Sequence, residues 1–577
     1  MPRPVPIGID DFRDLRERGL EYIDKSRLIC DLIDDEGALA VLLPRPRRFG
    51  KTLNLSMLRC FFERRADDLS HLFEGLSVWQ AGGRYRAHFQ RHPVIHFTFK
   101  GAKHERFEDT WGAIQEKIRV LFDEHRALLD SGQLTDREIA NYRAVVGGTA
   151  ERSLYHRALA DLSSYLHRVH GERVVILIDE YDEPIHAGYT GGYIQPILDF
   201  FRAFFTEGLK GNPHLHKAVL TGILRVARES VFSGLNNLAV YSLLAPRYGT
   251  AFGFTEAEVT ALLARAGCPE MLGAVRSYYN GYVFGREAIY NPWSILNFLH
   301  QGDHVLRPYW VSTSANDLVK DLLMHHTPAV QSDIEVLFEG GSIERRLDEN
   351  VALGDLRERE DALWSLLVFS GYLKAEEGAG VPGEVPPYRL SIPNREVRQV
   401  YSTTFRHWME DRLRAHGGSL RLLTTALFAG DAAGLEEQLQ TFATNLLSYH
   451  DTPRQDPERV YQAFLIGLFA SLEPDYQVRS NRESGAGRPD VLIRPALPGK
   501  PGVLLELKVV EASRSAPTAA LDAALAQIEA GNYTAELTAA GATPVHRFAV
   551  AFDGKRVWVR SAADPGSKQR ARRRKLP

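Results

Sequence analysis

The sequence has few cysteines and no long apolar run. Its three cysteines, Cys30, Cys60 and Cys268, show neither CxxC spacing nor a paired framework, which argues against a secreted disulfide scaffold and favours reduced thiols. Apolar runs such as ALAVLL at 38–43 are far too short to cross a bilayer, and the N-terminus lacks the apolar segment of a signal peptide. We therefore expect a soluble cytoplasmic protein that does not act at a membrane.

The chain also lacks a strong charge of either sign. The formal net charge is only −3, so any affinity for nucleic acid must come from a local patch. Hydrophobic residues make up 44% of the chain and charged residues 25%, which is typical of globular proteins rather than disordered ones. At 577 residues the chain exceeds the size of a single hydrophobic core, so we expect several domains.

The N-terminal part alternates short apolar runs with longer helical stretches, which predicts a parallel sheet flanked by helices. These runs are apolar at successive positions, as in strands covered on both faces. The predicted strands are LAVLL at 39–43, VIHFTF at 94–99, VVILID at 174–179 and AVLTGI at 218–223.

The remaining chain predicts further domains. FTEAEVTALLARAG at 254–267 has a helix start, an acidic first turn and a glycine stop, whereas EEGAGVPGEVPP at 376–387 reads as a long hairpin loop or linker. Asp553 and Gly554 lie between two β-rich runs and predict a hairpin. The predicted divisions are 1–250, an α/β core; 251–375, a helical, winged-helix-like lid; 376–450, a hairpin and helical connector; 451–565, a smaller α/β domain; and 566–577, a basic disordered tail.

A strand, a short loop ending in Gly-Lys-Thr and a helix follow one another in LAVLLPRPRRFGKTLNLSML. This is the context of a P-loop, whose backbone amides and helix N-terminus face phosphate oxygens. Lys51 would reach the β and γ phosphates, and the Thr52 hydroxyl would complete a Mg²⁺ shell. Arg45 stands where the general pattern has its first glycine, so an ordinary helix start remains the alternative. The predicted ATP-binding residues of the loop are Arg47, Arg48, Phe49, Gly50, Lys51 and Thr52.

A second half of the nucleotide site is predicted where the strand VVILID ends. Asp179 would hold Mg²⁺ at the carboxyl edge of the sheet, and Glu180 would orient or deprotonate the attacking water. At the end of the next strand, Thr221 would sense the γ-phosphate, and Arg225 or Arg228 would neutralise charge in the transition state. The alternatives are solvated acids at a strand end and ordinary arginines on a helix surface.

These residues resemble a known family, the AAA-ATPase-like proteins of bacteria that carry a C-terminal domain of the PD-(D/E)XK nuclease superfamily. The resemblance covers nearly the whole chain and implies an AAA-like P-loop core followed by a restriction-endonuclease-like α/β domain. In that family RPRRFGKT is the usual form of the loop, so Arg45 is no departure there. The segments that carry it are IGIDDFRDLRERGLEYIDKSRLI, RPRRFGKTLNLSMLRCFF, ILIDEYDEPI, TGILRVARESVFSGLNNL, YNGYVFG, YNPWSILNFL, YWVSTSAN, SGYL and SNRESGAGRPD with LLELKV.

A candidate nuclease centre lies in the C-terminal domain. The alternation of LLELKVV at 504–510 puts Glu506 and Lys508 on one face of a strand, and a hairpin can bring Asp490 beside Glu506. The two carboxylates suit Mg²⁺, and the lysine could activate water for attack on phosphorus. Glu458 would supply a further acid, and Gln527 would orient a phosphate or water. The alternative is an exposed strand face with an ion pair.

Arg479, Arg482, Arg488 and the basic tail could contact the phosphates of nucleic acid, or they could be solvated surface charges. We expect an ATPase with ATP and Mg²⁺ as cofactors, coupled to a nuclease whose expected substrate is DNA, with RNA as the alternative. The alternatives are an ATP-dependent switch or scaffold with a non-cleaving nucleic-acid-binding domain, and an interaction protein with a degenerate P-loop. Self-association into a homo-oligomer is left open by the sequence.

Overall fold

The computed structural model divides into two compact units. The first comprises Met1–His325 and Ser342–Val397, and the second comprises His326–Gly341 and Arg398–Pro577. The residues that the structure describes are 3–223, 237–310, 340–350, 359–378, 386–399, 420–446, 475–479, 489–510, 516–531 and 534–562, with scattered single positions between these ranges.

The first unit is built on a parallel sheet with the strand order β2-β3-β4-β1-β5. All of its neighbouring strands pair in parallel, which confirms the predicted α/β core. Every residue of β1 and β3 is buried, as expected for strands covered on both faces. The bounds are β1 Ala40–Pro44, β2 Val94–Thr98, β3 Val174–Asp179, β4 Leu215–Gly222 and β5 Leu238–Val240.

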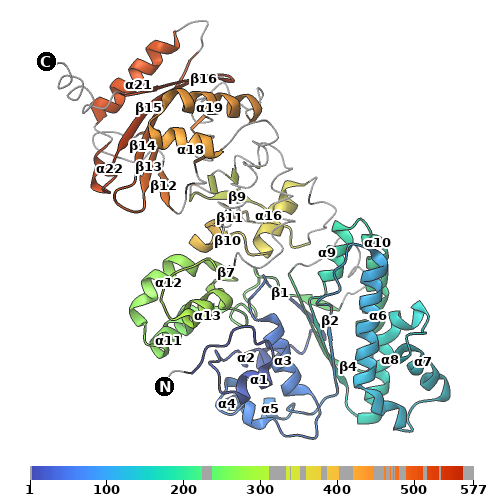
Figure 1. Ribbon diagram of the computed structural model, residues 1–577. Helices are drawn as coiled ribbons and strands as arrows, with labels where there is room; N and C mark the ends of the chain where they lie inside the picture. The colour runs from blue at the N-terminus through green and yellow to red at the C-terminus, as the bar shows by residue number, and fades with distance from the viewer. Residues whose placement is uncertain are drawn as a thin grey trace, which may run out of the picture. The chain divides into compact units, whose positions relative to one another are not determined.

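Helices flank this sheet on both sides (Figure 1), with α1 to α5 on one side and α6, α7, α8 and α10 on the other. The phenylalanine-rich helix α10 packs against α8, and α3 contacts β3. The bounds are α1 Phe12–Glu17, α2 Arg27–Asp34, α3 Lys51–Phe62, α4 Ser77–Gln80, α5 Gly83–Arg86, α6 Phe107–Glu124, α7 Asp136–Val146, α8 Arg152–His170, α9 Glu183–Thr190 and α10 Ile194–Leu209.

The region after this core contains the predicted helices and also short strands that the sequence pattern did not predict. Helix α11 (Glu256–Ala266) begins with a capping box formed by Thr255 and Glu258 and ends at Gly267 in the left-handed conformation, as predicted. Helices α12 (Leu272–Tyr279) and α13 (Pro292–Gln301) accompany a small antiparallel sheet of order β6-β8-β7. Its strands, Phe254–Thr255, Glu287–Tyr290 and Tyr282–Phe284, are too short to show a period of two.

A second small sheet of the first unit has the order β10-β11-β9. Strands β10 (Lys374–Glu377) and β11 (Tyr388–Ser391) pair antiparallel with Glu377 opposite Tyr388. The Gly- and Pro-rich segment therefore joins two strands of a hairpin, as predicted. Strand β9 (Ile343–Arg345) and helix α16 (Glu360–Phe369) complete this part. Among the described residues, no helix is long and apolar enough to span a bilayer.

The second unit contains a mixed sheet of order β12-β13-β14-β15-β16, in which β14 and β15 are parallel and the other pairs antiparallel. Its apolar side chains face α18 (Leu420–Ala429) and α19 (Ala432–Leu446) on one side, and α21 (Pro517–Gly531) and α22 (Ala535–Ala539) on the other. The predicted hairpin is present, with Asp553 opposite Arg556. The bounds are β12 Tyr476–Arg479, β13 Val491–Pro495, β14 Gly502–Val509, β15 Val545–Asp553 and β16 Arg556–Ser561.

Candidate nucleotide and metal sites

The loop between β1 and α3 turns sharply before the helix begins. Arg48 has a φ of 67° and Gly50 a φ of 85°, so two residues adopt the left-handed conformation within three positions. Glycine takes this conformation at little cost, whereas arginine does so at a cost of about 1 kcal/mol. The turn brings the N-terminus of α3 to the carboxyl edge of the sheet, where a helix N-terminus favours an anion.

Lys51 is buried and lies inside its own loop. Its Nζ donates hydrogen bonds to the carbonyl oxygens of Arg45 and Pro46, both at 3.0 Å. Burial lowers the pKa of Lys51, and the nearby charge of Asp179 opposes that shift. Bound phosphate oxygens would exchange these two neutral acceptors for charged ones, which make stronger hydrogen bonds.

Asp179 brings together three segments that are far apart in the chain. The Thr52 hydroxyl donates to its Oδ2 at 2.7 Å, and the Thr221 hydroxyl donates to its Oδ1 at 2.5 Å. The backbone amide of Glu180 also donates to Oδ1, at 3.0 Å. Thus Thr52, Asp179 and Thr221, which were predicted on separate segments, share one hydrogen-bond network, and both carboxylate oxygens of Asp179 have donors.

Glu180 follows at a φ of 50°, which turns the chain away from β3. Burial raises the pKa of its carboxyl, and the charge of Asp179 raises it further. A higher pKa makes a carboxylate a better proton acceptor near neutral pH. The next acids hold backbone amides: Asp182 accepts from Ile223 N at 2.7 Å and Glu183 accepts from Gly101 N at 2.6 Å.

Arg45 is fully buried and anchors the loop. Its guanidinium donates to the carbonyl oxygens of Pro44 at 2.7 Å, Tyr241 at 2.8 Å and Tyr248 at 3.2 Å. It also lies over the rings of Phe252 and Phe284, 5.2 and 5.5 Å from their centroids. Burial lowers the pKa of Arg45 to about 9. The arginine therefore ties the loop to the segment after β5, which a glycine could not do.

Aromatic residues of the later region surround the tip of this loop. The Trp310 indole donates to the Arg47 carbonyl oxygen at 3.4 Å, and the Arg48 guanidinium lies 4.4 Å from the Trp293 ring centroid. The Phe49 ring is buried, 5.0 and 5.1 Å from the rings of Tyr282 and Phe284. These contacts of Trp293 and Trp310 with the loop could not be predicted from the sequence, because the tryptophans lie more than 240 residues from it.

In the second unit, the pairing of β13 with β14 brings Asp490 to Glu506. Val491 is opposite Leu505, so Asp490, one residue earlier, adjoins the next positions of β14. The Asp490 carboxylate accepts a hydrogen bond from Leu507 N at 2.8 Å, and its carbonyl oxygen accepts one from Gln462 at 2.8 Å.

Glu506 is 1% exposed, and its Oε2 has no hydrogen-bond partner among the described residues. Its Oε1 lies 3.5 Å from Lys508 Nζ. Burial, followed by the charge of Asp490, raises the pKa of Glu506 to about 7. A buried carboxylate oxygen without a donor, beside a second carboxylate, fits a hard cation such as Mg²⁺, which takes oxygen ligands.

The other predicted residues lie elsewhere. Gln527 is exposed on α21, the helix that packs against β14 and β15. Arg479 forms an ion pair with Glu536 of α22 and donates to Gln477 at 2.8 Å. Outside the described residues fall Arg225, Arg228, Glu458, Arg482, Arg488 and the tail at 566–577.

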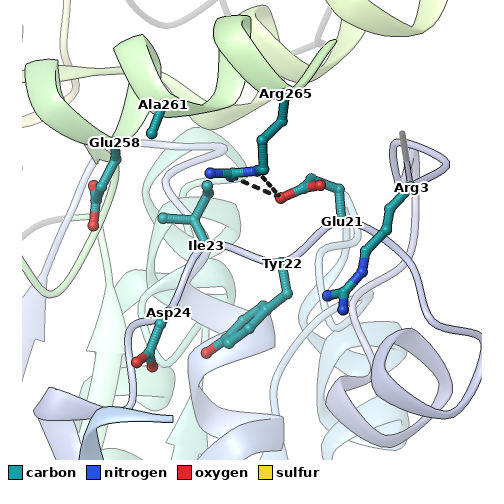
Figure 2. Close-up of a pocket in the computed structure, with 8 residues that line it drawn as sticks. All are labelled: Arg3, Glu21, Tyr22, Ile23, Asp24, Glu258, Ala261 and Arg265. Carbon is teal, nitrogen blue, oxygen red and sulfur yellow. Dashed lines mark hydrogen bonds and ion pairs between the residues drawn. The ribbon is translucent and has the colours of Figure 1, made fainter. Parts of the chain in front are cut away.

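A pocket separate from both candidate sites lies between the N-terminal segment and α11 (Figure 2). Two of its acidic groups form ion pairs, since Arg265 pairs with Glu21 at 2.8 Å and Lys25 pairs with Glu258 at 2.8 Å. These pairs join the sheet core to α11. The lining residues are Arg3, Glu21, Tyr22, Ile23, Asp24, Glu258, Ala261 and Arg265.

The fold and the two sites define a protein that joins a P-loop α/β core to a mixed sheet with an Asp and Glu-x-Lys arrangement. Residues 6–232 match the family model described as Predicted AAA-ATPase, and residues 456–562 match that of the PD-(D/E)XK nuclease superfamily. The chain is 30% identical to a protein of Azotobacter chroococcum mcd 1 named "Uncharacterized protein in vnfD 5'region". The alignment extends over 567 residues and covers 95% of this chain and 96% of that protein. The chain belongs to the family of AAA-ATPase-like proteins that carry a C-terminal PD-(D/E)XK nuclease superfamily domain.

Proposed function

We propose that the protein is an ATP-binding AAA-like ATPase coupled to a Mg²⁺-dependent nuclease domain that cleaves nucleic acid, with DNA as the first candidate substrate and RNA as the second. One observation carries the proposal: the buried Oε2 of Glu506, which has no partner in the described part of the chain, lies in a group with Asp490 and Lys508. Burying a carboxylate without a donor is costly, and such a cost is tolerated where function needs it. The three unpaired, buried cysteines fit a reducing compartment such as the cytoplasm.

In the nucleotide site, phosphate oxygens would take the place of the Arg45 and Pro46 carbonyl oxygens as acceptors for Lys51. Thr52 and Asp179 already share a hydrogen bond and would both turn to Mg²⁺, which would offset charge on the β and γ phosphates. Thr221 would sense the γ-phosphate through Asp179. Glu180 would accept the proton of the attacking water.

In the nuclease site, Asp490 and Glu506 would hold Mg²⁺, which would supply Lewis-acid stabilisation of the charge that develops on the phosphate. Lys508 would position the attacking water beside the two carboxylates. The water oxygen would form a bond to phosphorus as the bond from phosphorus to the leaving oxygen breaks. The proton of the water would pass to a neighbouring base, and the leaving oxygen would take a proton from solvent. Cleavage therefore requires Asp490, Glu506 and Lys508 together.

The proposal is tested by incubating the purified full-length protein with linear duplex DNA and with single-stranded RNA, in Mg²⁺, with and without ATP. The Asp490→Ala variant is the test, and the Asp475→Ala variant is its matched control because Asp475 is an exposed acid of the same unit. We expect DNA cleavage by the wild type and the control but not by Asp490→Ala. Equal cleavage by all three proteins would overturn the nuclease assignment.

One observation favours a second function, a nucleotide-dependent switch whose C-terminal domain binds nucleic acid without cutting it. In the P-loop site, Lys51 and both oxygens of Asp179 have internal partners. ATP would exchange one complete set of contacts for another, which is how a ligand shifts a two-state equilibrium. This function predicts ATP binding with negligible turnover and no cleavage, and a measured ATP turnover that Lys51→Ala abolishes would exclude it.

A further inference from the structure

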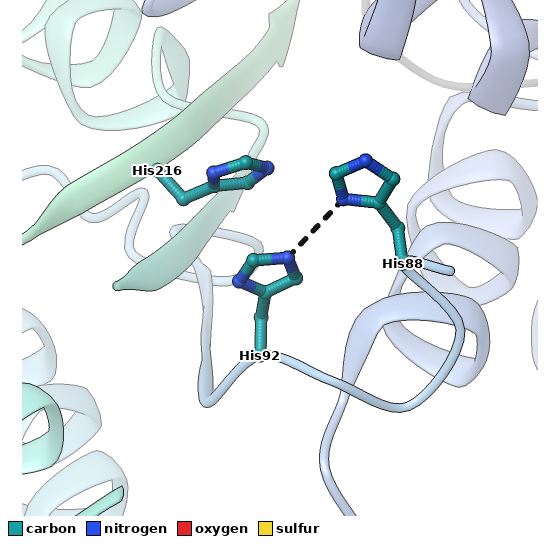
Figure 3. Close-up of side chains that lie close together, drawn as sticks. All are labelled: His88, His92 and His216. Atoms are coloured by element: carbon teal, nitrogen blue, oxygen red, sulfur yellow. Dashed lines mark hydrogen bonds between the residues drawn. The ribbon is translucent and has the colours of Figure 1, made fainter. Parts of the chain in front are cut away.

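Three histidines meet in the first unit, away from both sites described above. His88 follows α5, His92 lies two residues before β2, and His216 lies at the start of β4 (Figure 3). One ring nitrogen from each lies within 4.8 Å of the others. Strands β2 and β4 begin here, whereas Asp179 and Thr221 lie where their strands end. The cluster thus occupies the edge of the sheet opposite the nucleotide site.

The backbone holds two of these histidines firmly. His92 N donates to the Phe62 carbonyl oxygen at 2.9 Å, and its own carbonyl oxygen accepts from Arg64 N at 2.7 Å. His216 occupies an irregularity in the pairing of β3 with β4, because Val174 pairs with Leu215 while Val175 pairs with Lys217. His216 is thus an extra residue in β4, and such a β-bulge changes the direction of the side chain that it carries.

The hydrogen bonds of His92 determine which of its nitrogens is free to bind. Its Nδ1 lies 3.0 Å from the carbonyl oxygen of Arg173, and a carbonyl oxygen only accepts, so Nδ1 carries the proton. The Nε2 lone pair then faces the cluster and accepts a hydrogen bond from Nδ1 of His88 at 3.4 Å, a contact that a bound metal ion would replace. A ligating histidine in proteins commonly donates its other N–H to a backbone carbonyl in this way.

The charge state of the cluster also suits a ligand set. Burial lowers the pKa of His88 and His92, and it lowers that of His216 to about 3, so the rings are neutral as metal ligands must be. The nearby cations have partners of their own: Arg91 pairs with Glu172 at 2.9 Å, and Arg84 pairs with Asp34 and Glu36, both at 3.2 Å.

The separation of the first two nitrogens matches that of metal ligands. Two nitrogens bound to one tetrahedral zinc at about 2.0–2.1 Å lie about 3.3 Å apart, close to the 3.4 Å between His88 and His92. The His216 ring stacks on His92 with centroids 4.0 Å apart. Metal binding therefore requires this half-buried ring to rotate, so that one of its nitrogens joins those of His88 and His92. We propose that His88, His92 and His216 bind a divalent transition-metal ion of the zinc class, with water as a further ligand.

Such an ion would join two segments that lie far apart in the chain: the connection between α5 and β2, which carries His88 and His92, and the start of β4, which carries His216. It would stabilise the sheet from the edge opposite the P-loop. The site does not depend on ATP binding or on nucleic-acid cleavage, so its test can succeed or fail independently of the proposed function.

The test is a calorimetric titration of chelator-treated full-length protein with Zn²⁺ alone, together with the visible absorption of bound Co²⁺. All proteins carry Asp490→Ala, which removes one carboxylate of the nuclease site. The protein with this change alone is called the parent. His88→Gln and His216→Gln are the test variants because both side chains are half-buried, so glutamine can replace them without an internal cavity. His71→Gln is the matched control, since His71 is an exposed histidine of the same unit.

We expect one equivalent of Zn²⁺ in the parent and in His71→Gln, and loss of that equivalent in His88→Gln and His216→Gln. Zn²⁺ should also raise the melting temperature of the parent but not that of the two test variants. The proposal is overturned if Zn²⁺ binding is absent in the parent, unchanged in the test variants, or equally lost in the control.

Discussion

The two candidate sites differ in how their buried charges are matched. In the P-loop site, both oxygens of Asp179 accept hydrogen bonds from hydroxyl or amide donors, and Lys51 donates to two carbonyl oxygens. In the C-terminal sheet, Oε2 of Glu506 is buried with no donor among the residues that the structure describes. A ligand must therefore displace the internal contacts of Asp179 and Lys51 to enter the first site. The second has a carboxylate oxygen open to a cation.

The difference has an energetic consequence. An internal hydrogen bond is worth about 1 kcal/mol net, whereas hydrogen bonds to charged groups are worth about twice as much. Nucleotide binding at the first site would thus exchange internal hydrogen bonds for hydrogen bonds to phosphate, with a modest net gain in binding free energy. A cation at the second site would relieve the cost of a buried, unmatched carboxylate, so Mg²⁺ should bind there even without ATP.

The largest expected effect concerns the second site. Lys508→Ala should lower the rate of DNA cleavage by about 10³-fold, because a side chain that positions or activates the attacking water contributes about 10² to 10⁴-fold. Cleavage is measured under single-turnover conditions. Lys500→Ala is the matched control because Lys500 lies just before the same strand and is partly exposed. A Lys508→Ala enzyme as fast as the control would remove the lysine from the mechanism.

The next effect concerns the stability of the first site. Arg45→Gly should reduce the free energy of unfolding by about 3 to 4 kcal/mol, because three carbonyl oxygens lose a charged donor. Denaturant unfolding of both proteins measures this loss. Arg48→Gly in the same loop should change stability by less than about 1 kcal/mol, since it loses a cation–π contact but relieves a left-handed φ. Equal losses in the two variants would contradict the anchoring role of Arg45.

The third expected effect tests whether ATP phosphates replace the internal contacts of Lys51. Lys51→Ala should weaken ATP binding by about 100-fold, the equivalent of about 3 kcal/mol for the loss of charged hydrogen bonds to phosphate. Equilibrium binding of a fluorescent ATP analogue measures it. Lys210→Ala, which removes an exposed lysine of the same unit, should leave the affinity unchanged. If both variants bind ATP like the wild type, the nucleotide does not use this loop.

The smallest expected effect concerns the buried carboxylate of Glu396, which belongs to neither candidate site and is compared with Asp179 and Glu506. Glu396 accepts hydrogen bonds from the Ser294 hydroxyl at 2.7 Å and from Trp310 N at 2.8 Å, yet burial raises its pKa to about 7. Because the pKa of the Glu396 carboxyl is raised in the folded state, the free energy of unfolding falls as pH rises from about 4.5 to about 7. Above pH 7 Glu396→Gln should therefore stabilise the first unit by about 2 kcal/mol, the linkage gain less the cost of a buried amide N–H.

Denaturant unfolding at pH 5 and pH 8 measures this effect. The stabilisation by Glu396→Gln should be larger at pH 8 than at pH 5, because the wild-type carboxyl must ionise only at the higher pH. The same difference at both pH values would show that Glu396 does not titrate in this range.

Local patterns predicted the parts of the fold and of the sites that depend on neighbouring residues. The apolar runs of β1 and β3, the start and glycine stop of helix α11, and the hairpin that brings Asp490 to Glu506 all follow from periodicity and turn chemistry. The anchoring of Arg45 could not be predicted, because its acceptors Tyr241 and Tyr248 lie 196 and 203 residues away. The histidine cluster was missed for the same reason, since His216 is far from the other two in the chain.

The central claim, that nucleotide binding at the P-loop acts on cleavage by the C-terminal domain, is tested most directly by one measurement. The single-turnover rate of DNA cleavage in Mg²⁺ is compared with and without ATP for the wild type and for Lys51→Ala. We predict that ATP changes the rate of the wild type and leaves that of Lys51→Ala unchanged. A wild-type rate that ATP does not alter, or an equal response in both proteins, would contradict the claim.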